Sequence, residues 1–204
     1  SGLSPYLHFG KISSFEIVDK VFDQQPKDWS IDDLNPAGGK NRGYFKGHEY
    51  IDSFMDEIIT WREVGYHFAH VRPDYAEFES LPDWALKSHA EHEQDPRETI
   101  YTLEELENSK THDDIWNAAQ RQLVEEGIIH NYLRMLWGKN ILAWTPNAKT
   151  ALEYMIHLNN KYALDGRNPN SYSGIFWVLG RFDRAWGPER PVFGKIRYLY
   201  LQYC

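Results

Sequence analysis

Leu-Asn-Asn-Lys-Tyr-Ala-Leu-Asp-Gly-Arg, at residues 158–167, ends a helical pattern on a carboxylate, a glycine and a cation. Asn159 falls on the same helical face as Leu152 and Met155, so a polar amide lies on an apolar stripe. A buried amide needs a hydrogen-bond partner, which either the core or a bound ligand can supply. The stretch therefore predicts a helix with one polar group on its buried face and a turn near Asp165.

Helical periodicity runs through most of the chain, and no strand pattern persists. We expect one helix after a Ser14 cap, a second over residues 51–70 that ends before Pro73, and a short third that begins with a capping box of Thr102 and Glu105. A fourth helix should cover residues 113–126 and stop at Gly127, and a fifth should cover about 128–143. A sixth should open at Thr145-Pro146 and run through Tyr162. Residues 26–47 are expected to form a loop without Walker or dinucleotide-binding glycine spacing. The sequence predicts an all-α fold, with a single domain over residues 1–204.

The composition is that of a globular protein, with 42% apolar and 15% aromatic residues among 204. The only cysteine is Cys204, so an intrachain disulfide is excluded and a reducing, cytoplasmic location is expected. No apolar run is long enough to span a membrane, and no signal peptide is evident.

The net charge of -8 argues against a protein that coats DNA without selectivity. The charge is nevertheless uneven. Residues 72–126 carry fifteen acids against five bases, whereas residues 166–204 carry six bases against two acids. A basic C-terminal face suits local docking to nucleic acid, and a plain solvated surface explains the charges equally well.

Glu57 and Trp61 are four residues apart, so an α-helix would direct both side chains to one side. They are either a surface glutamate with a half-buried indole, or a carboxyl and a ring that hold a base between them. The histidine pairs at 67/70 and 89/92 lack a third ligand at suitable spacing, so no metal site is predicted.

Arg134, Trp137 and Trp144 share one helical face, together with an isoleucine of the core stripe. A buried arginine needs an anionic partner. Asp165, after the next helix, is the candidate for that partner.

These segments, together with Leu3-Ser4-Pro5-Tyr6-Leu7-His8-Phe9-Gly10 and Phe193-Gly194-Lys195-Ile196-Arg197-Tyr198, make nearly the whole chain resemble the flavin-binding catalytic domain of DNA photolyases. The resemblance is closest to the class II cyclobutane pyrimidine dimer branch, from which Asn131 departs because that branch has glycine there. It implies the helical domain of the photolyase and cryptochrome superfamily, without the N-terminal α/β antenna domain, and hence a fragment of a longer chain.

The resemblance also implies FAD as cofactor and a role for each matching residue. Cofactor contacts are implied for Leu3, Ser4, Arg134, Asn159 and Asp165, with the arginine–aspartate pair against the flavin ring and the asparagine facing its N5 atom. Trp137 and Trp116 match the tryptophans that relay an electron to the flavin, while Trp144 is expected to be structural. Glu57, Trp61 and Trp177 match residues that hold the dimer, and Arg184, Lys195 and Arg197 are expected to contact DNA.

The function implied is the light-driven repair of cyclobutane pyrimidine dimers in double-stranded DNA by an electron from reduced FAD. Two alternatives stay open. One is a cryptochrome-like blue-light sensor that binds flavin without repair, and the other is a cofactor-free DNA-binding or interaction domain.

Overall fold

The computed structural model describes residues 2–35, 42–46 and 48–199, so Cys204 and part of the predicted 26–47 loop lie outside the described residues. In the described part, the regular structure is helical and no strand forms, apart from one isolated bridge between Arg190 and Gly194. The all-α prediction is confirmed. No helix in these ranges has the length and apolarity needed to cross a membrane. Contacts divide the chain into two compact units, Ser1–Val71 and Arg72–Cys204, and the single domain over residues 1–204 stays a prediction.

The first unit consists of short helices around a small core. Its elements are α1 (Ser4–His8), α2 (Ser14–Phe22), a 3₁₀ turn (Ile31–Asp33), α3 (Glu49–Met55), a π-helical segment η2 (Asp56–Trp61) and α4 (Arg62–Val71). Ser13, rather than the predicted Ser14, caps α2, because its hydroxyl oxygen accepts the Glu16 backbone N–H at 3.0 Å. The core joins Ile17 of α2 to Met55 of α3 and Ile58 of η2.

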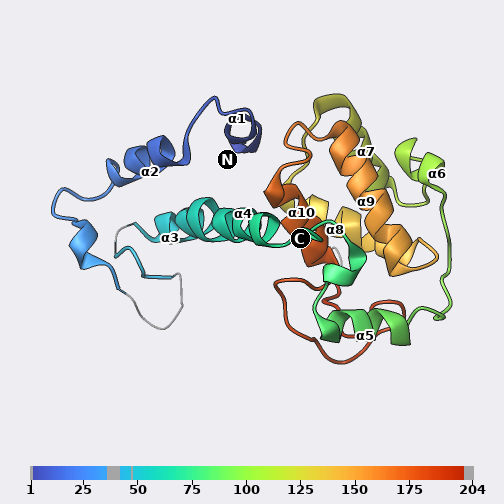
Figure 1. Cartoon of the computed structure of the whole chain (residues 1–204). Helices are drawn as coiled ribbons and strands as arrows, with labels where there is room; N and C mark the ends of the chain where they lie inside the picture. Colours follow the sequence, from blue (N-terminus) through green and yellow to red (C-terminus); the bar gives the residue numbers. More distant parts are fainter. Residues whose placement is uncertain (1, 36–41, 47, 200–204) are drawn as a thin grey trace. The chain divides into compact units, whose positions relative to one another are not determined.

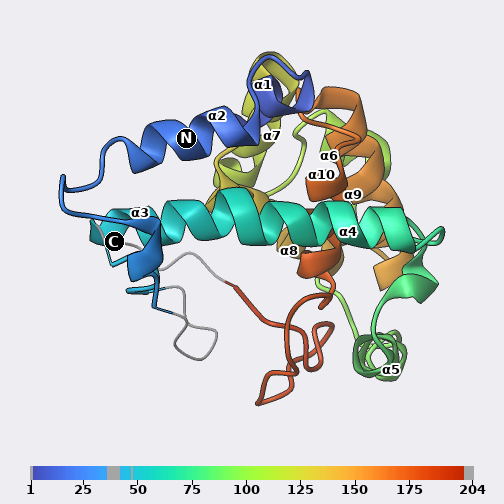
Figure 2. The same ribbon diagram turned by 60° about the vertical axis from the view of Figure 1, so that its left-hand side comes forward.

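The elements α3, η2 and α4 follow one another without a break and form one long rod, with α2 beside its first half (Figure 2). The prediction of a helix over residues 51–70 that ends before Pro73 is confirmed in its extent. The helix is not a regular α-helix throughout, because residues 56–61 form a π-helix, which has a wider turn.

The second unit is a bundle in which α8 contacts three other helices, α7, α9 and α10 (Figure 1). Its elements are a 3₁₀ turn (Phe78–Ser80), α5 (Asp83–Glu91), α6 (Leu103–Glu107), α7 (Asp114–Glu126), α8 (Asn131–Ala143), α9 (Ala148–Tyr162) and α10 (Pro169–Val178). The close approach of α8 to α10 depends on Gly138, since a Cβ there would lie 2.7 Å from a methyl group of Val178.

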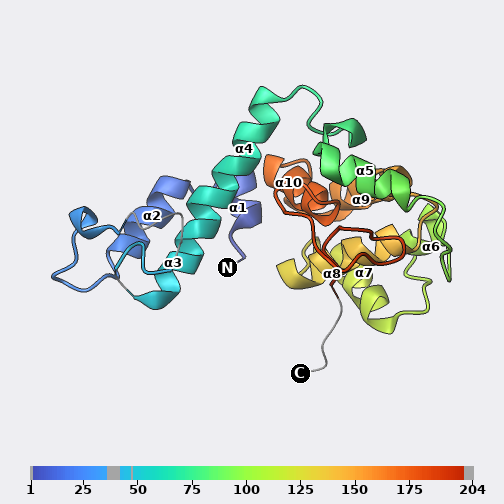
Figure 3. The ribbon, with the colours of Figure 1, turned by 90° about the horizontal axis from the view of Figure 1, so that it is seen from below.

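Local signals set most helix ends of the second unit. The capping box of Thr102 and Glu105 is present, and Gly127 ends α7 with a left-handed backbone, φ 71°. The predicted opening at Thr145-Pro146 was wrong, because Asn147 caps α9 and accepts the Thr150 N–H at 2.9 Å. The Thr145 hydroxyl instead donates to the Ile141 carbonyl at the end of α8. Figure 3 shows the segment after α10 running alongside α5.

Candidate functional site

The π-helical segment η2 carries Glu57 and Trp61. The Trp61 indole N–H donates to Asp56 Oδ2 at 3.0 Å, so this ring has a hydrogen-bond partner five positions before it. Glu57 keeps contact with solvent, yet partial burial of its carboxyl, followed by the neighbouring charge of Asp56, raises its pKa. Residues four apart also lie on one side of a π-helix, so the common side of Glu57 and Trp61 stays a prediction, and Asp56 is a contact that the spacing argument missed.

Arg134 of α8 and Asp165, which follows α9, form the predicted ion pair. Their nearest atoms, Nη1 and Oδ1, are 3.6 Å apart, and the side chains are 24% and 19% exposed. The Nε of Arg134 is buried and has no hydrogen-bond partner within the described ranges. Asn159 is 2% exposed, and among the described residues its amide makes only a long bond of 3.4 Å to Asn160 Oδ1. Here the second unit has hydrogen-bonding capacity that its own side chains leave largely unused.

Trp116 of α7 and Trp137 of α8 are stacked, with ring centroids 6.4 Å apart and planes within 1° of parallel. The Trp116 indole N–H donates to the backbone carbonyl of Trp137 at 3.1 Å. The Trp137 indole N–H donates to Gln120 Oε1 at 2.8 Å. Both rings are 3% exposed, so the pair is held in a dry environment. Two coupled aromatic rings of this kind can pass an electron.

Trp144 packs edge-on against Trp116, with centroids 5.7 Å apart. Trp144 also contacts the rings of Tyr101 and His112, whose centroids lie 5.5 Å and 5.1 Å from its own. The Tyr101 hydroxyl and His112 Nδ1 share a hydrogen bond of 2.7 Å. Trp144 is buried in this cluster, and its structural role stays a prediction.

Trp177 is half-buried on α10, one residue before Val178, whose carbonyl accepts the ammonium of Lys139 at 2.6 Å. Lys139 is 1% exposed, and burial lowers its pKa to about 7. Sequence reasoning missed this lysine, although Leu136 and Leu142, which lie three residues before and after it on α8, are buried. This hydrogen bond ties α8 to the C-terminal end of α10, next to Trp177.

The segment after α10 brings two of the three predicted DNA contacts together. The guanidinium groups of Arg184 and Arg197 lie 4.3 Å and 4.4 Å from the ring centroid of Trp186. Asp183 accepts the Trp186 indole N–H at 3.0 Å and forms an ion pair with Arg197 Nε at 2.8 Å. Sequence reasoning missed Trp186 and Asp183, although both lie within the basic stretch.

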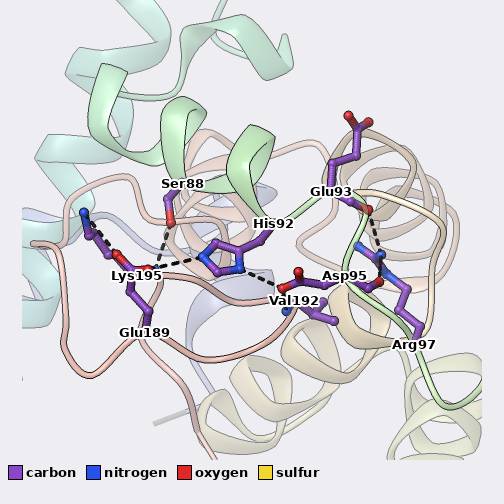
Figure 4. Close-up of polar contacts among 8 residues, drawn as sticks. All are labelled: Ser88, His92, Glu93, Asp95, Arg97, Glu189, Val192 and Lys195. Atoms are coloured by element: carbon purple, nitrogen blue, oxygen red, sulfur yellow. Dashed lines mark hydrogen bonds and ion pairs between the residues drawn. The ribbon is translucent and has the colours of Figure 1, made fainter.

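The third predicted contact, Lys195, is part of a polar cluster that joins α5 to the same segment (Figure 4). Lys195 Nζ is 3.2 Å from Glu189, and Glu189 is in turn 3.5 Å from His92 Nε2. His92 Nδ1 contacts Asp95 at 2.7 Å, which is the main cause of a raised pKa at His92. His89, by contrast, shares a hydrogen bond of 3.0 Å with the Leu179 carbonyl, so the two histidines have different partners.

Leu3 and Ser4 belong to the first unit, where Ser4 is the first residue of α1 and Leu3 precedes it. The side chain of Leu3 makes no capping bond. Their predicted contact with a pyrophosphate stays a prediction.

The residues of the second unit fit a planar, redox-active ring such as a flavin. The unused Nε of Arg134 can donate to a ring carbonyl, while Asp165 balances the arginine's charge. The buried amide of Asn159 can donate to or accept from a ring nitrogen that changes protonation with redox state.

No family model matches the chain. It is 39% identical over 199 residues to a deoxyribodipyrimidine photo-lyase of Methanothermobacter thermautotrophicus, a match that covers 98% of this chain and 39% of the relative. It is 40% identical over 205 residues to a protein of the same name from Oryza sativa subsp. japonica, covering 100% and 37%. A third, from Potorous tridactylus, is 38% identical over 205 residues, covering 100% and 35%. The chain thus spans less than two fifths of the length of each of these relatives.

Proposed function

This chain belongs to the photolyase family, and we propose from that premise that it is the catalytic part of a light-driven enzyme that repairs cyclobutane pyrimidine dimers in DNA. The observation that carries the proposal is an identity of 38–40% along nearly the whole chain to four relatives that are all deoxyribodipyrimidine photo-lyases.

FAD, when bound in its reduced form, would supply the light-excited electron donor. Arg134 and Asp165 would hold the cofactor ring, Asn159 would offer it a hydrogen bond, and Leu3 and Ser4 would contact its phosphates. Trp116 and Trp137 carry an electron toward the ring when the cofactor has to be reduced. The ion pair, the buried amide and the parallel indoles support these assignments.

Glu57 acts on the dimer by donating a hydrogen bond from a protonated carboxyl. The raised pKa of Glu57 supports this role, since it favours the protonated form. Negative charge develops on the base carbonyl after electron uptake, and a donor already in position stabilises it. Trp61 and Trp177 pack against the flipped dimer, and Arg184, Lys195 and Arg197 contact the opened duplex.

The test is repair of a dimer-containing duplex under blue light after the protein has been loaded with FAD. Glu57→Gln should lower the repair rate by roughly tenfold, less than the 10²–10³ typical for complete loss of a donor, because the amide keeps an N–H. Glu16→Gln, an exposed glutamate of α2, is the matched control and should repair normally.

An unchanged repair rate in Glu57→Gln would remove that residue from the mechanism. Protein that binds and photoreduces flavin but repairs nothing would indicate a cryptochrome-like sensor. Protein that retains no flavin would indicate a cofactor-free DNA-binding or interaction domain.

A further inference from the structure

Gln120 is a buried amide of α7 with a single hydrogen-bond partner in the described part of the chain. Its exposed fraction is 0%, and its Oε1 accepts the Trp137 indole N–H at 2.8 Å. Its Nε2 is buried without a partner there. An unpaired buried donor costs stability, and an apolar residue of similar volume would avoid the cost. The bond to the indole is what this residue contributes.

Both indole N–H groups of the stacked pair point at oxygens that are not bases. Trp137 donates to the carboxamide of Gln120, and Trp116 donates to the backbone carbonyl of Trp137. An amide oxygen accepts a hydrogen bond without taking the proton. A carboxylate or imidazole at either position is basic enough to take it, because an indole becomes far more acidic once it has lost an electron.

The carboxylate that lines a cavity beside the pair already has hydrogen-bond partners. Asp113 lines a small cavity of about 20 Å³ together with Trp116 and Trp137. Its Oδ1 accepts the backbone N–H groups of Ile115 and Trp116, both at 2.9 Å. Its Oδ2 accepts the Asn140 amide at 3.3 Å. These bonds hold Asp113 as the cap of α7, and the indole N–H groups are directed elsewhere.

We propose that Gln120 fills the acceptor position of the Trp137 indole N–H with a group that is not a base, so that the Trp137 ring stays protonated after oxidation and can take an electron from Trp116. The inference rests on the proposed function, because the first oxidant is a photoexcited flavin. In the step itself, one electron passes from the Trp116 ring to the oxidised Trp137 ring, and both Nε1–H bonds stay intact. Proton loss from Trp137 would instead leave a neutral radical, which is a weaker oxidant and would not draw the electron onward.

The first test follows the radicals by transient absorption after a light flash, since the cation and neutral radicals of tryptophan absorb at different wavelengths. Two variants place a base beside the ring: Gln120→Glu and Gln120→His, the latter at about pH 8, where imidazole is neutral. Both should form the neutral radical early and lower the rate of transfer from Trp116 by roughly tenfold or more. Gln120→Leu introduces no base and should keep the cation radical and the onward transfer.

The control is Gln122→Glu, the same change on the same helix, at an amide that bonds Glu126 at the surface. It should behave like the unmodified protein. Onward transfer at the normal rate in both base-bearing variants would overturn the inference. So would an equal loss in Gln120→Leu, because packing alone would then explain the effect.

A second test needs no cofactor. In a ¹⁵N spectrum of the tryptophan side chains, the Trp137 indole signal, assigned with Trp137→Phe, should exchange slowly with solvent. Gln120→Leu should shift that signal and leave the Trp116 signal in place. A Trp137 signal that does not move in Gln120→Leu would overturn this inference and leave the proposed function standing. An intact bond in a protein that never binds flavin would overturn the proposed function, and the inference with it.

Discussion

Replacing the buried Lys139 with methionine should change how stability depends on pH. Burial lowers the pKa of Lys139 to about 7 in the folded protein from an ordinary value of 10.5, with the charge of Asp183 opposing the shift. Between these two values the unfolded chain holds a proton that the folded chain has released. Raising the pH through this interval therefore stabilises the folded state. Lys139→Met abolishes this contribution, because methionine does not titrate.

The size of the effect follows from the interval. One pKa unit corresponds to ~1.4 kcal/mol, so this group adds roughly 4 kcal/mol to the free energy of unfolding between about pH 7 and about pH 10. The variant also leaves the Val178 carbonyl without its ammonium donor, which costs ~1–3 kcal/mol. That cost shifts the whole curve and leaves its slope unchanged.

The assay is urea unfolding followed by tryptophan fluorescence at several pH values in this range. The free energy of unfolding of the unmodified protein should rise with pH relative to that of Lys139→Met. The contributions of all other groups cancel in this comparison, because those groups titrate equally in both proteins. Lys149→Met is the control, since Lys149 is exposed and its partner Glu79 raises its pKa. A difference that stays flat with pH for Lys139→Met would refute the reasoning and show a lysine that remains charged in the core.

Three further changes test other parts of the structure. Gly194→Ala should lower the thermal midpoint by several degrees, equivalent to about 1–3 kcal/mol, because φ is +51° and a Cβ would overlap Ser88 Oγ; an unchanged midpoint in a melting scan would contradict this. The stabilisation lost in His92→Gln should be largest below about pH 6.5 and should disappear as pH rises through the raised folded pKa of His92, as melting scans across pH can check. Asp165→Asn should weaken FAD binding by roughly tenfold in a fluorescence titration, because the charge of Arg134 loses its partner; equal affinity would remove the pair from the cofactor site.

Helix ends were predictable where a short-range bond decides them. The capping box at Thr102 and the glycine at 127 each act within a few residues, so the sequence alone identifies them. Thr145 shows where such reasoning fails. Its hydroxyl could either cap the next helix or bond to the preceding one. It donates to the Ile141 carbonyl at the end of α8, and Asn147 caps α9 instead.

In the candidate site, the pairing of Arg134 with Asp165 was predictable because a buried cation requires an anion. The arrangement of Trp116 and Trp137 was not, since helical spacing identifies one face of α8 but not the angle at which a ring from α7 meets it. The contact of His92 with Glu189 joins residues far apart in the chain. No local pattern signals such a contact, because it depends on how the segment after α10 returns to α5.

Because of the wide turn at Asp56–Trp61, the rod formed by α3, η2 and α4 contains one residue more than a regular α-helix of the same length along its axis. Regular α-helical winding of the same residues would rotate every later side chain of α4 by about 100° around the axis, since each residue of an α-helix turns by that angle. Phe68, buried in α4, would leave its packing partners, while Ile51 and Met55 would keep theirs. The surplus residue thus sets the angular offset between the two halves of the rod, so each half can face its own neighbours.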